Sequence, residues 1–155
     1  LGLMLEHFRW YNADVVVGSK LHSASKVAYP WQRKVLSKGY QILNRFLFGL
    51  RVRDTQVGMK FFRREVLEDV LPRLLVKEFA FDIEILAVAR HLGYTRIYEA
   101  PVEIDFTGIS SITTTSFWKV SLKMLWDTLA VFYRLNILNY YDSTNKDNWK
   151  KESEP

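Results

Sequence analysis

Apolar and polar positions follow two different periods along the chain, and these periods predict a mixture of helices and strands. Apolar residues spaced three and four apart predict helices over 1–11, 31–50, 64–75, 82–91 and 116–139, with a distortion of the third near Pro72. A run of β-branched residues over 14–18 predicts a buried strand. Weaker alternation predicts strands at the end of 53–62 and over 94–105. This order of elements predicts an α/β protein.

The helices over 31–50 and 116–139 carry the clearest patterns. The first has a wide apolar face and a polar stripe formed by Lys34, Lys38, Gln41 and Arg45. The second confines its charges to one narrow stripe and is apolar around the rest of its circumference. Such a helix either packs deeply into its domain, which is the general case, or lies in a membrane interface. The polar stretch 142–155 is predicted to be disordered, which leaves 1–141 as the folded unit.

The composition supports one folded domain. The chain has 155 residues, of which 48% are hydrophobic and 15% aromatic, enough for a sizeable core. It has no cysteine, which excludes disulfides, thiolate metal sites and cysteine nucleophiles. No stretch has the length and apolar character of a transmembrane helix. The sequence starts at Leu1 without a visible secretory signal, and we expect this start to lie inside a longer protein.

The charge is distributed unevenly. Residues 20–64 hold 11 basic side chains and one acidic side chain, whereas the remainder holds 11 basic and 16 acidic ones. A field as one-sided as this attracts anions such as phosphates, nucleic acid or an acidic membrane surface. A solvated basic face explains the charge alone equally well.

The segment 53–60 combines residue types that suit a phosphate-bearing substrate. Arg53 and Lys60 can hold phosphate oxygens, while Asp54 and Gln56 can accept hydrogen bonds from sugar hydroxyls or orient a nucleophile. Gly58 lets a ligand approach the backbone closely, or supplies a turn that other residues cannot form. Taken alone, a surface hairpin explains the segment about as well.

Two further positions place polar side chains at the ends of elements. Ser19 and Lys20 follow the strand over 14–18, at the sheet edge where α/β proteins bind ligands; an ordinary turn is the alternative. Asp82 and Glu84 stand where a loop leads into a helix, and their spacing of two does not bring them to one face. Capping of that helix by Asp82 is the alternative to a role in the site.

Five short motifs occur together in one order and spacing. They are Gly18-Ser19-Lys20; Ser25, Arg33 and Ser37; Asp54-Thr55-Gln56 with Gly58 and Lys60; Phe81-Asp82 with Glu84; and Glu99 with Pro101 and Val102. With them, residues 1–141 resemble the C-terminal portion of the catalytic domain of family 2 glycosyltransferases that act on polyprenyl phosphates, the dolichyl-phosphate glucosyltransferase and mannose synthase type. Val57 and Met59 replace the cysteine and phenylalanine of the family pattern.

The resemblance implies an incomplete GT-A fold, a Rossmann-like α/β fold, with a long C-terminal amphipathic helix. It implies inverting transfer of a hexose from a nucleotide-sugar of the UDP-glucose or GDP-mannose type to a polyprenyl phosphate, with a divalent Mg or Mn ion. The family places its Asp-x-Asp metal motif before the position of Leu1, so no metal ligand is assigned here, and we expect these residues alone to be inactive. The implied location is the cytoplasmic face of a membrane, peripheral or anchored by segments outside this chain.

The same resemblance suggests roles for individual residues. Asp54 and Gln56 are expected to orient groups at the reacting centre, with Asp82 as an alternative carboxylate. Contacts with substrate and phosphate are expected from Ser19, Lys20, Arg33, Ser37, Gly58, Lys60 and Glu84.

Two alternatives from other functional classes stay open at this point. A basic nucleic-acid-binding module fits the isoelectric point near 9.4 and the interleaved aromatic residues, although no nucleic-acid motif occurs. A non-catalytic membrane-surface protein fits the helix over 116–139. Salt-dependent binding of random oligonucleotides favours the first, and liposome binding without sugar transfer favours the second.

Overall fold

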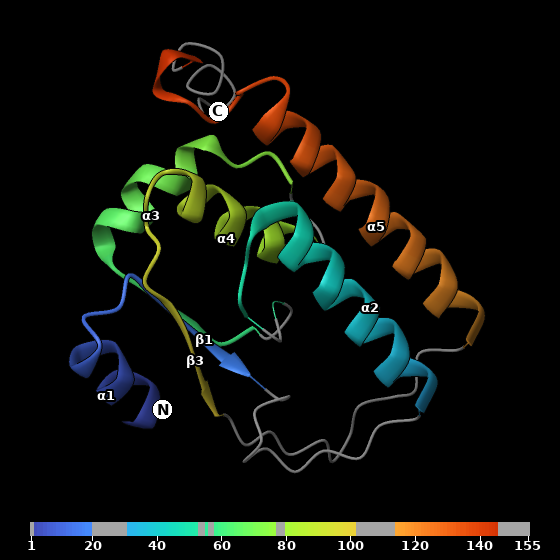
Figure 1. Cartoon of the computed structure of the whole chain (residues 1–155), viewed down its shortest axis with the longest axis horizontal. Helices are drawn as coiled ribbons and strands as arrows, with labels where there is room; N and C mark the ends of the chain where they lie inside the picture. Colours follow the sequence, from blue (N-terminus) through green and yellow to red (C-terminus); the bar gives the residue numbers. More distant parts are fainter. Residues whose placement is uncertain are drawn as a thin grey trace.

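The computed structural model describes residues 2–19, 31–52, 55, 58–76, 80–101 and 114–145. In this part of the chain a three-stranded sheet is flanked by helices on both sides (Figure 1). The elements are α1 (Gly2–Trp10), β1 (Val15–Ser19), α2 (Trp31–Phe48), β2 (Lys60–Phe62), α3 (Arg64–Val70), α4 (Phe81–His91), β3 (Ile97–Pro101) and α5 (Thr114–Asn136). Short 3-10 turns, η1 (Leu71–Arg73) and η2 (Ser143–Asn145), follow α3 and α5. The α/β class predicted from the sequence is confirmed.

The sheet is mixed, with β1 in the centre. β3 pairs with β1 in parallel, so that Ser19 stands opposite Pro101. β2 pairs with β1 antiparallel, so that Lys60 stands opposite Val17. The ends of β1 and β3 and the beginning of β2 therefore lie at one edge of the sheet, which we call the Ser19 edge.

The core lies on both faces of β1, and this is why the strand is apolar without alternation. Val15 and Val17 join the large cluster that contains α4 and the buried side of α5. Val16 faces the other way and packs with Met4 of α1. The residues of α4 from Ile83 to Ala89 are all buried, because the helix lies between the sheet and the two long helices.

The two long helices are less covered than their apolar patterns suggest. α2 buries Asn44 and Phe48, while Val35, Ile42 and Phe46 of its expected apolar face are exposed. α5 buries its second half at Val131 and Leu135. Large apolar side chains are exposed along another side of it: Leu122, Leu125, Trp126, Leu129 and Tyr133. Deep packing of α5 on several sides is therefore wrong for the described residues.

The helix predicted over 64–75 ends at Val70 and is followed by a tighter 3-10 turn, Leu71–Arg73, which contains Pro72; proline lacks the N–H that a continued α-helix requires. Within the strand predicted over 94–105, Ile97–Pro101 form a strand, and 102–105 lie outside the described residues. The fold also continues through Asn145, four residues past the expected boundary. Residues 146–155 lie outside the described part.

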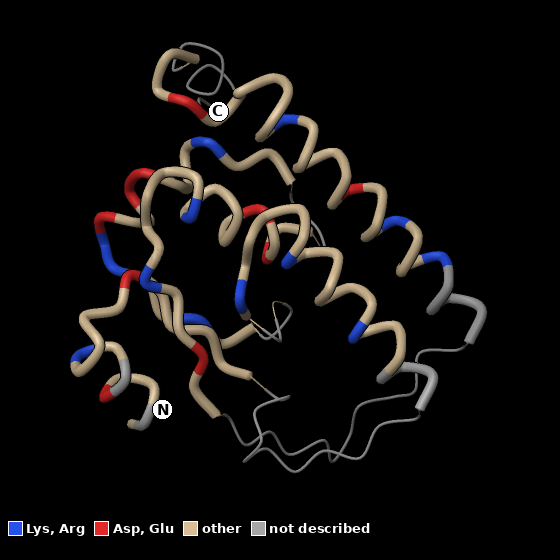
Figure 2. The backbone as a smooth tube through the Cα atoms, viewed as in Figure 1, with Lys and Arg blue, Asp and Glu red and all other residues tan. Residues whose placement is uncertain are grey.

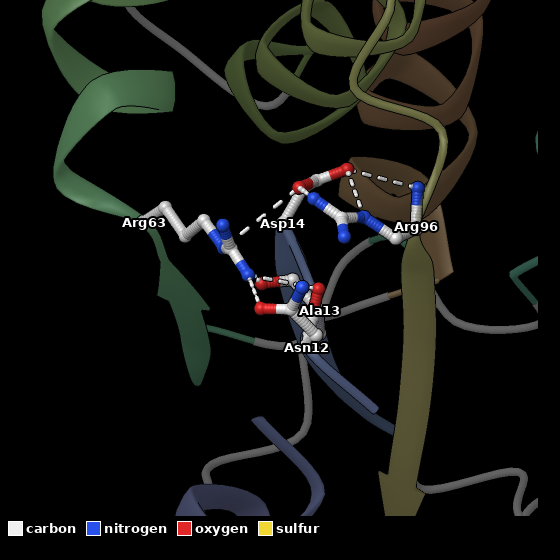
Figure 3. A network of polar contacts seen from close by, with 5 residues as sticks. All are labelled: Asn12, Ala13, Asp14, Arg63 and Arg96. Atoms are coloured by element: carbon white, nitrogen blue, oxygen red, sulfur yellow. Dashed lines mark hydrogen bonds and ion pairs between the residues drawn. The ribbon is translucent and has the colours of Figure 1, made fainter. Parts of the chain in front are cut away.

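A polar cluster ties the three strands together at the end opposite the Ser19 edge (Figure 3). Asp14 is 4% exposed, and its carboxylate accepts hydrogen bonds from the Arg96 guanidinium at 2.7 Å and from the Arg96 backbone N–H at 3.1 Å. Arg63, just after β2, donates to the Ala13 carbonyl oxygen at 2.8 Å and also contacts Asn12. These bonds fix the far ends of all three strands relative to one another.

Among the described helices, none combines the length and the apolar character needed to cross a membrane.

Candidate active site

The Ser19 edge gathers predicted site residues from three separate parts of the sequence. Ser19 ends β1 and is fully buried, and Gly58 lies in the exposed bend that precedes β2. Lys60 is the first residue of β2, and Asp82 lies in the first turn of α4. Because β2 is antiparallel to β1, its beginning reaches the edge at which β1 ends.

An ion pair between Lys60 and Asp82 is the central contact of this edge. Lys60 Nζ lies 2.6 Å from Asp82 Oδ1, and the two side chains are 5% and 29% exposed. A lysine ammonium carries three donor hydrogens, so Lys60 can bond to more than one acceptor at once. The arrangement holds a nearly buried positive charge at a fixed place, with a partly accessible carboxylate beside it.

The capping role considered for Asp82 is wrong. Ala80 is the N-cap of α4, and its carbonyl oxygen accepts from the N–H groups of Ile83 and Glu84 at 3.1 and 2.9 Å. No side chain caps the helix. The carboxylate of Asp82 is therefore directed to Lys60 of the neighbouring strand, a contact that favours the role in the site.

Gly58 lies in a bend with space around it. A Cβ atom at Gly58 would meet nothing within 4 Å. The open space beside it is consistent with the predicted close approach of a ligand.

Glu84 lies apart from Asp82, on the buried side of α4. It is 0% exposed, and its carboxylate accepts from the backbone N–H groups of Leu75 and Val76 and from the Tyr141 hydroxyl, the last at 2.6 Å. Arg134 Nη1 is 3.9 Å away. A carboxylate enclosed in this way holds the segment after η1 and the end of the fold together, so its contacts favour a structural role over contact with substrate.

The remaining predicted residues are placed only in part. Lys20, Asp54 and Gln56 lie outside the described residues. Arg33 belongs to α2, but its side chain lies outside the described part as well. Ser37 is exposed on α2. Their roles stay predictions.

The basic side chains described within the segment 20–64 are spread over several elements (Figure 2). Arg63 binds backbone oxygens at the end opposite the Ser19 edge. Arg64 pairs with Glu68 on the exposed surface of α3 at 2.7 Å. These two charges are thus engaged away from the Ser19 edge, whereas Lys60 lies at that edge.

The described side chains form no group of three or more His, Asp or Glu residues that could hold a metal ion. No metal ligand is assigned within this part of the chain.

The amino-acid sequence of the chain is similar to those of several glycosyltransferases. The chain is 32% identical over 118 residues to the polyprenol monophosphomannose synthase of Mycolicibacterium smegmatis, a match that covers 72% of this chain and 43% of that protein. It is 33% identical over 132 residues to the human dolichyl-phosphate beta-glucosyltransferase, covering 83% of this chain and 39% of that protein. A dolichyl-phosphate beta-glucosyltransferase of Trichomonas vaginalis is 32% identical over 130 residues.

Two other comparisons give no match: no family model matches the chain, and no solved structure matches it significantly. The chain spans about two fifths of the length of the curated relatives that it matches. The agreement nevertheless extends over most of this chain and recurs in enzymes from distant organisms. The chain is therefore a distant homologue of the polyprenyl- and dolichyl-phosphate glycosyltransferases and corresponds to part of those proteins.

Proposed function

We propose that the chain is part of a GT-A, inverting glycosyltransferase that moves a hexose from a nucleotide-sugar to a polyprenyl phosphate at the cytoplasmic surface of a membrane. The observation that carries the proposal is its homology to enzymes whose names specify both polyprenol and dolichyl-phosphate acceptors. The Lys60–Asp82 pair at the Ser19 edge supports it from geometry.

The phosphate group of the acceptor needs no strong base to activate it, so an ion pair that binds the phosphate is enough at this position. A phosphate monoester has a second pKa of about 6, so the attacking oxygen is largely ionised at neutral pH without a strong base. The site must hold this anion next to the anomeric carbon and stabilise a transition state with oxocarbenium character. The Lys60 ammonium supplies a fixed positive charge, and Asp82 keeps it in place.

Binding of the nucleotide-sugar donor requires further side chains, and we assign no residue of this chain to that role. A divalent ion, Mg²⁺ or Mn²⁺, neutralises a departing nucleoside diphosphate in enzymes that use one. The described residues do not offer a set of ligands for it, so no step is routed through a metal. Asp54 and Gln56 are kept as candidates for orienting the reacting groups, on the strength of the motif alone.

Exposed apolar side chains support the membrane surface as the place of reaction. Leu122, Trp126 and Leu129 follow one another at helical spacing on α5 and are 64%, 73% and 42% exposed. Lys119 and Lys123 are exposed on the same helix. A helix with large apolar residues next to basic ones suits the interface of an anionic bilayer, where a polyprenyl phosphate presents its head group.

The direct test is a transfer assay with the protein expressed from its complete gene. Membranes are incubated with radiolabelled UDP-glucose or GDP-mannose and a polyprenyl phosphate, and the lipid-linked product is extracted. We expect label in the lipid fraction that depends on both substrates. Transfer at the level of a vector control, with either donor, would refute the proposal.

Two variants locate the activity at the Ser19 edge. Lys60→Met removes the fixed charge and is expected to lower kcat/KM by roughly 100-fold, and Asp82→Asn by a similar or smaller factor. Arg64→Met and Glu68→Gln are matched controls, since they alter an ion pair of the same kind on the exposed surface of α3. Equal activity of all four variants would place the reacting centre elsewhere.

Membrane contact is tested separately by sedimentation with vesicles. Trp126→Glu introduces a charge into the exposed apolar row and is expected to reduce binding to vesicles of phosphatidylserine and phosphatidylcholine at least fivefold. Ser143→Glu adds the same charge at the exposed η2 turn and serves as control. Unchanged binding of the Trp126 variant would remove α5 from the proposed membrane contact.

A further inference from the structure

The contact between α2 and α5 contains polar groups where apolar packing would suffice. Tyr40 and Phe48 lie two turns apart on the inner side of α2, and they meet Thr128 and Phe132 of α5. The Tyr40 and Thr128 hydroxyl oxygens are 2.7 Å apart, and the rings of Phe48 and Phe132 meet edge to face at 6.2 Å. Figure 1 shows the two helices running side by side.

The direction of this hydrogen bond follows from the hydrogens available. The Thr128 hydroxyl donates its single hydrogen to the Met124 carbonyl oxygen at 2.7 Å. The Tyr40 hydroxyl must therefore be the donor to Thr128 Oγ1. Thr128 is fully buried and Tyr40 is half-buried, so competition from water is limited to the Tyr40 side of the bond.

Asn44 adds a second polar group to the same interface. It lies one turn beyond Tyr40 and is 2% exposed; its amide acts on the Tyr40 phenol and opposes the rise in the pKa of that group, although it forms no hydrogen bond of normal geometry in the described structure. Buried polar groups cost stability unless they are paired. Their recurrence in one helix contact suggests that they determine how the helices are placed rather than how strongly they bind.

The same contact is connected to the Lys60–Asp82 pair. α4, which carries Asp82 in its first turn, packs against both α2 and α5. Burial raises the pKa of the Tyr40 phenol, and its bond to Thr128 opposes the rise. The negative charges of Asp127 and Asp82 make smaller contributions to the same rise in the pKa.

We propose that Tyr40 and Thr128 are positioning residues: their hydrogen bond fixes α2 along α5 and thereby holds the first turn of α4, with the Lys60–Asp82 pair, in the geometry that receives the lipid phosphate. The part concerning the phosphate rests on the proposed function. Apolar packing is less selective than a hydrogen bond about how one helix lies along another, and a shift of one turn would move a side chain by about 5.4 Å. The bond between the Tyr40 and Thr128 hydroxyl groups forms at only one such placement.

The first experiment measures placement without any ligand. Tyr40→Phe and Thr128→Val remove the bond with little change in volume, and Tyr133→Phe removes a half-exposed phenol from α5 as the control. In heteronuclear NMR spectra of the 155-residue chain, we expect the amide resonances of Lys60 and Asp82 to shift in both interface variants and to stay in place in the control. Unshifted resonances in both variants would overturn the proposal.

The second experiment separates placement from stability. Thr128→Val leaves the Tyr40 hydroxyl without its acceptor, whereas in Tyr40→Phe the Thr128 hydroxyl keeps its bond to the Met124 carbonyl oxygen and in the double variant Tyr40→Phe/Thr128→Val no hydroxyl is left unpaired. The double variant should therefore regain part of the melting temperature lost in Thr128→Val, while its Lys60 and Asp82 resonances stay shifted. If stability and resonances are restored together, the bond serves stability alone and the positioning role is wrong.

The third measurement uses geranyl phosphate as a soluble prenyl phosphate and inorganic phosphate for comparison. The interface variants, including the double variant, are expected to bind geranyl phosphate about fivefold to tenfold more weakly than the unmodified chain. Unchanged affinity in all of them would contradict the link to the phosphate site. This binding is measured with the protein expressed from its complete gene; if that protein binds geranyl phosphate no better than inorganic phosphate, the proposed function fails, and the resonance shifts still decide the placement role.

Discussion

Glu84 offers the sharpest test of how this fold is held together. Its enclosed carboxylate is the acceptor for two backbone N–H groups, Leu75 at 3.2 Å and Val76 at 2.9 Å, and for the Tyr141 hydroxyl at 2.6 Å. Burial, followed by the negative charge of Glu84, raises the pKa of Tyr141, so this phenol remains a donor throughout the neutral range. Three donors from two distant segments thus depend on one side chain.

The expected loss in free energy of unfolding follows from the number of hydrogen-bond donors that each substitution leaves unpaired. Tyr141→Phe removes one donor to a buried carboxylate and should lower the free energy of unfolding by about 1–2 kcal/mol. Glu84→Gln keeps the shape but turns an NH₂ group toward groups that also donate, which should cost about 2–3 kcal/mol. Glu84→Ala leaves all three donors and the nearby Arg134 without the carboxylate, and about 3–5 kcal/mol is expected.

Urea unfolding followed by circular dichroism and tryptophan fluorescence measures these differences. For a chain of this size, Glu84→Gln should melt about 5–10 °C below the unmodified protein. Glu68→Gln, a substitution of the same kind at a side chain that is 60% exposed, should change stability by less than about 0.5 kcal/mol. The reasoning fails if the Glu84 and Glu68 variants are equally stable, because the enclosed carboxylate would then contribute nothing beyond a surface one.

Two further predictions concern a tyrosine and a glycine. A hydrogen bond to Asp69 raises the pKa of Tyr94 from 10.0 to about 12. The stability that this bond contributes is therefore complete below pH 10 and is lost as the pH rises toward about 12. In Asp69→Asn, the ¹³Cζ resonance of Tyr94 should titrate closer to 10.0, and an unchanged titration would contradict this cause. Gly49 follows the last residue of α2 with φ +65°, and a Cβ atom there would lie 3.1 Å from Arg90 Nε. Gly49→Ala should therefore lower the free energy of unfolding in urea by about 1–2 kcal/mol. Gly39→Ala, inside the same helix with open space around it, is the control and should leave the free energy of unfolding unchanged or raise it.

The sequence was sufficient for elements with a strong local pattern. The apolar run after Asp14 predicted β1, and the spacing of apolar residues predicted α2 and α4, because burial of one face imposes a period on the residues themselves. It could not show which apolar face of α2 or α5 is covered. Both helices have more apolar surface than the fold buries, and the choice depends on contacts such as Phe48 with Phe132, which lie far apart in the sequence.

The candidate site was predictable in its motifs but not in its geometry. Asp82 and Glu84 look alike in sequence, and their separation into an accessible carboxylate and an enclosed one depends on how α4 is rotated against the sheet. The partner of Glu84, Tyr141, is 57 residues away and carries no motif. Tyr40 and Thr128 were likewise missed as a pair, although a polar residue recurring in an otherwise apolar helix face was a usable signal.

Because β2 runs antiparallel to β1, insertions before and after β2 have different effects on the sheet. Arg63 fixes the exit of β2: its backbone N–H donates to the Asp14 carbonyl oxygen at 3.0 Å, and its side chain binds the residues before β1. The entry of β2 is at the Ser19 edge, ahead of that anchor. An insertion before Gly58 lies ahead of the residues that bond to β1 and leaves the Arg63 anchor in place, whereas an insertion after Phe62 displaces the anchor itself. A change in length ahead of β2 should therefore cost the sheet less stability than the same change after it.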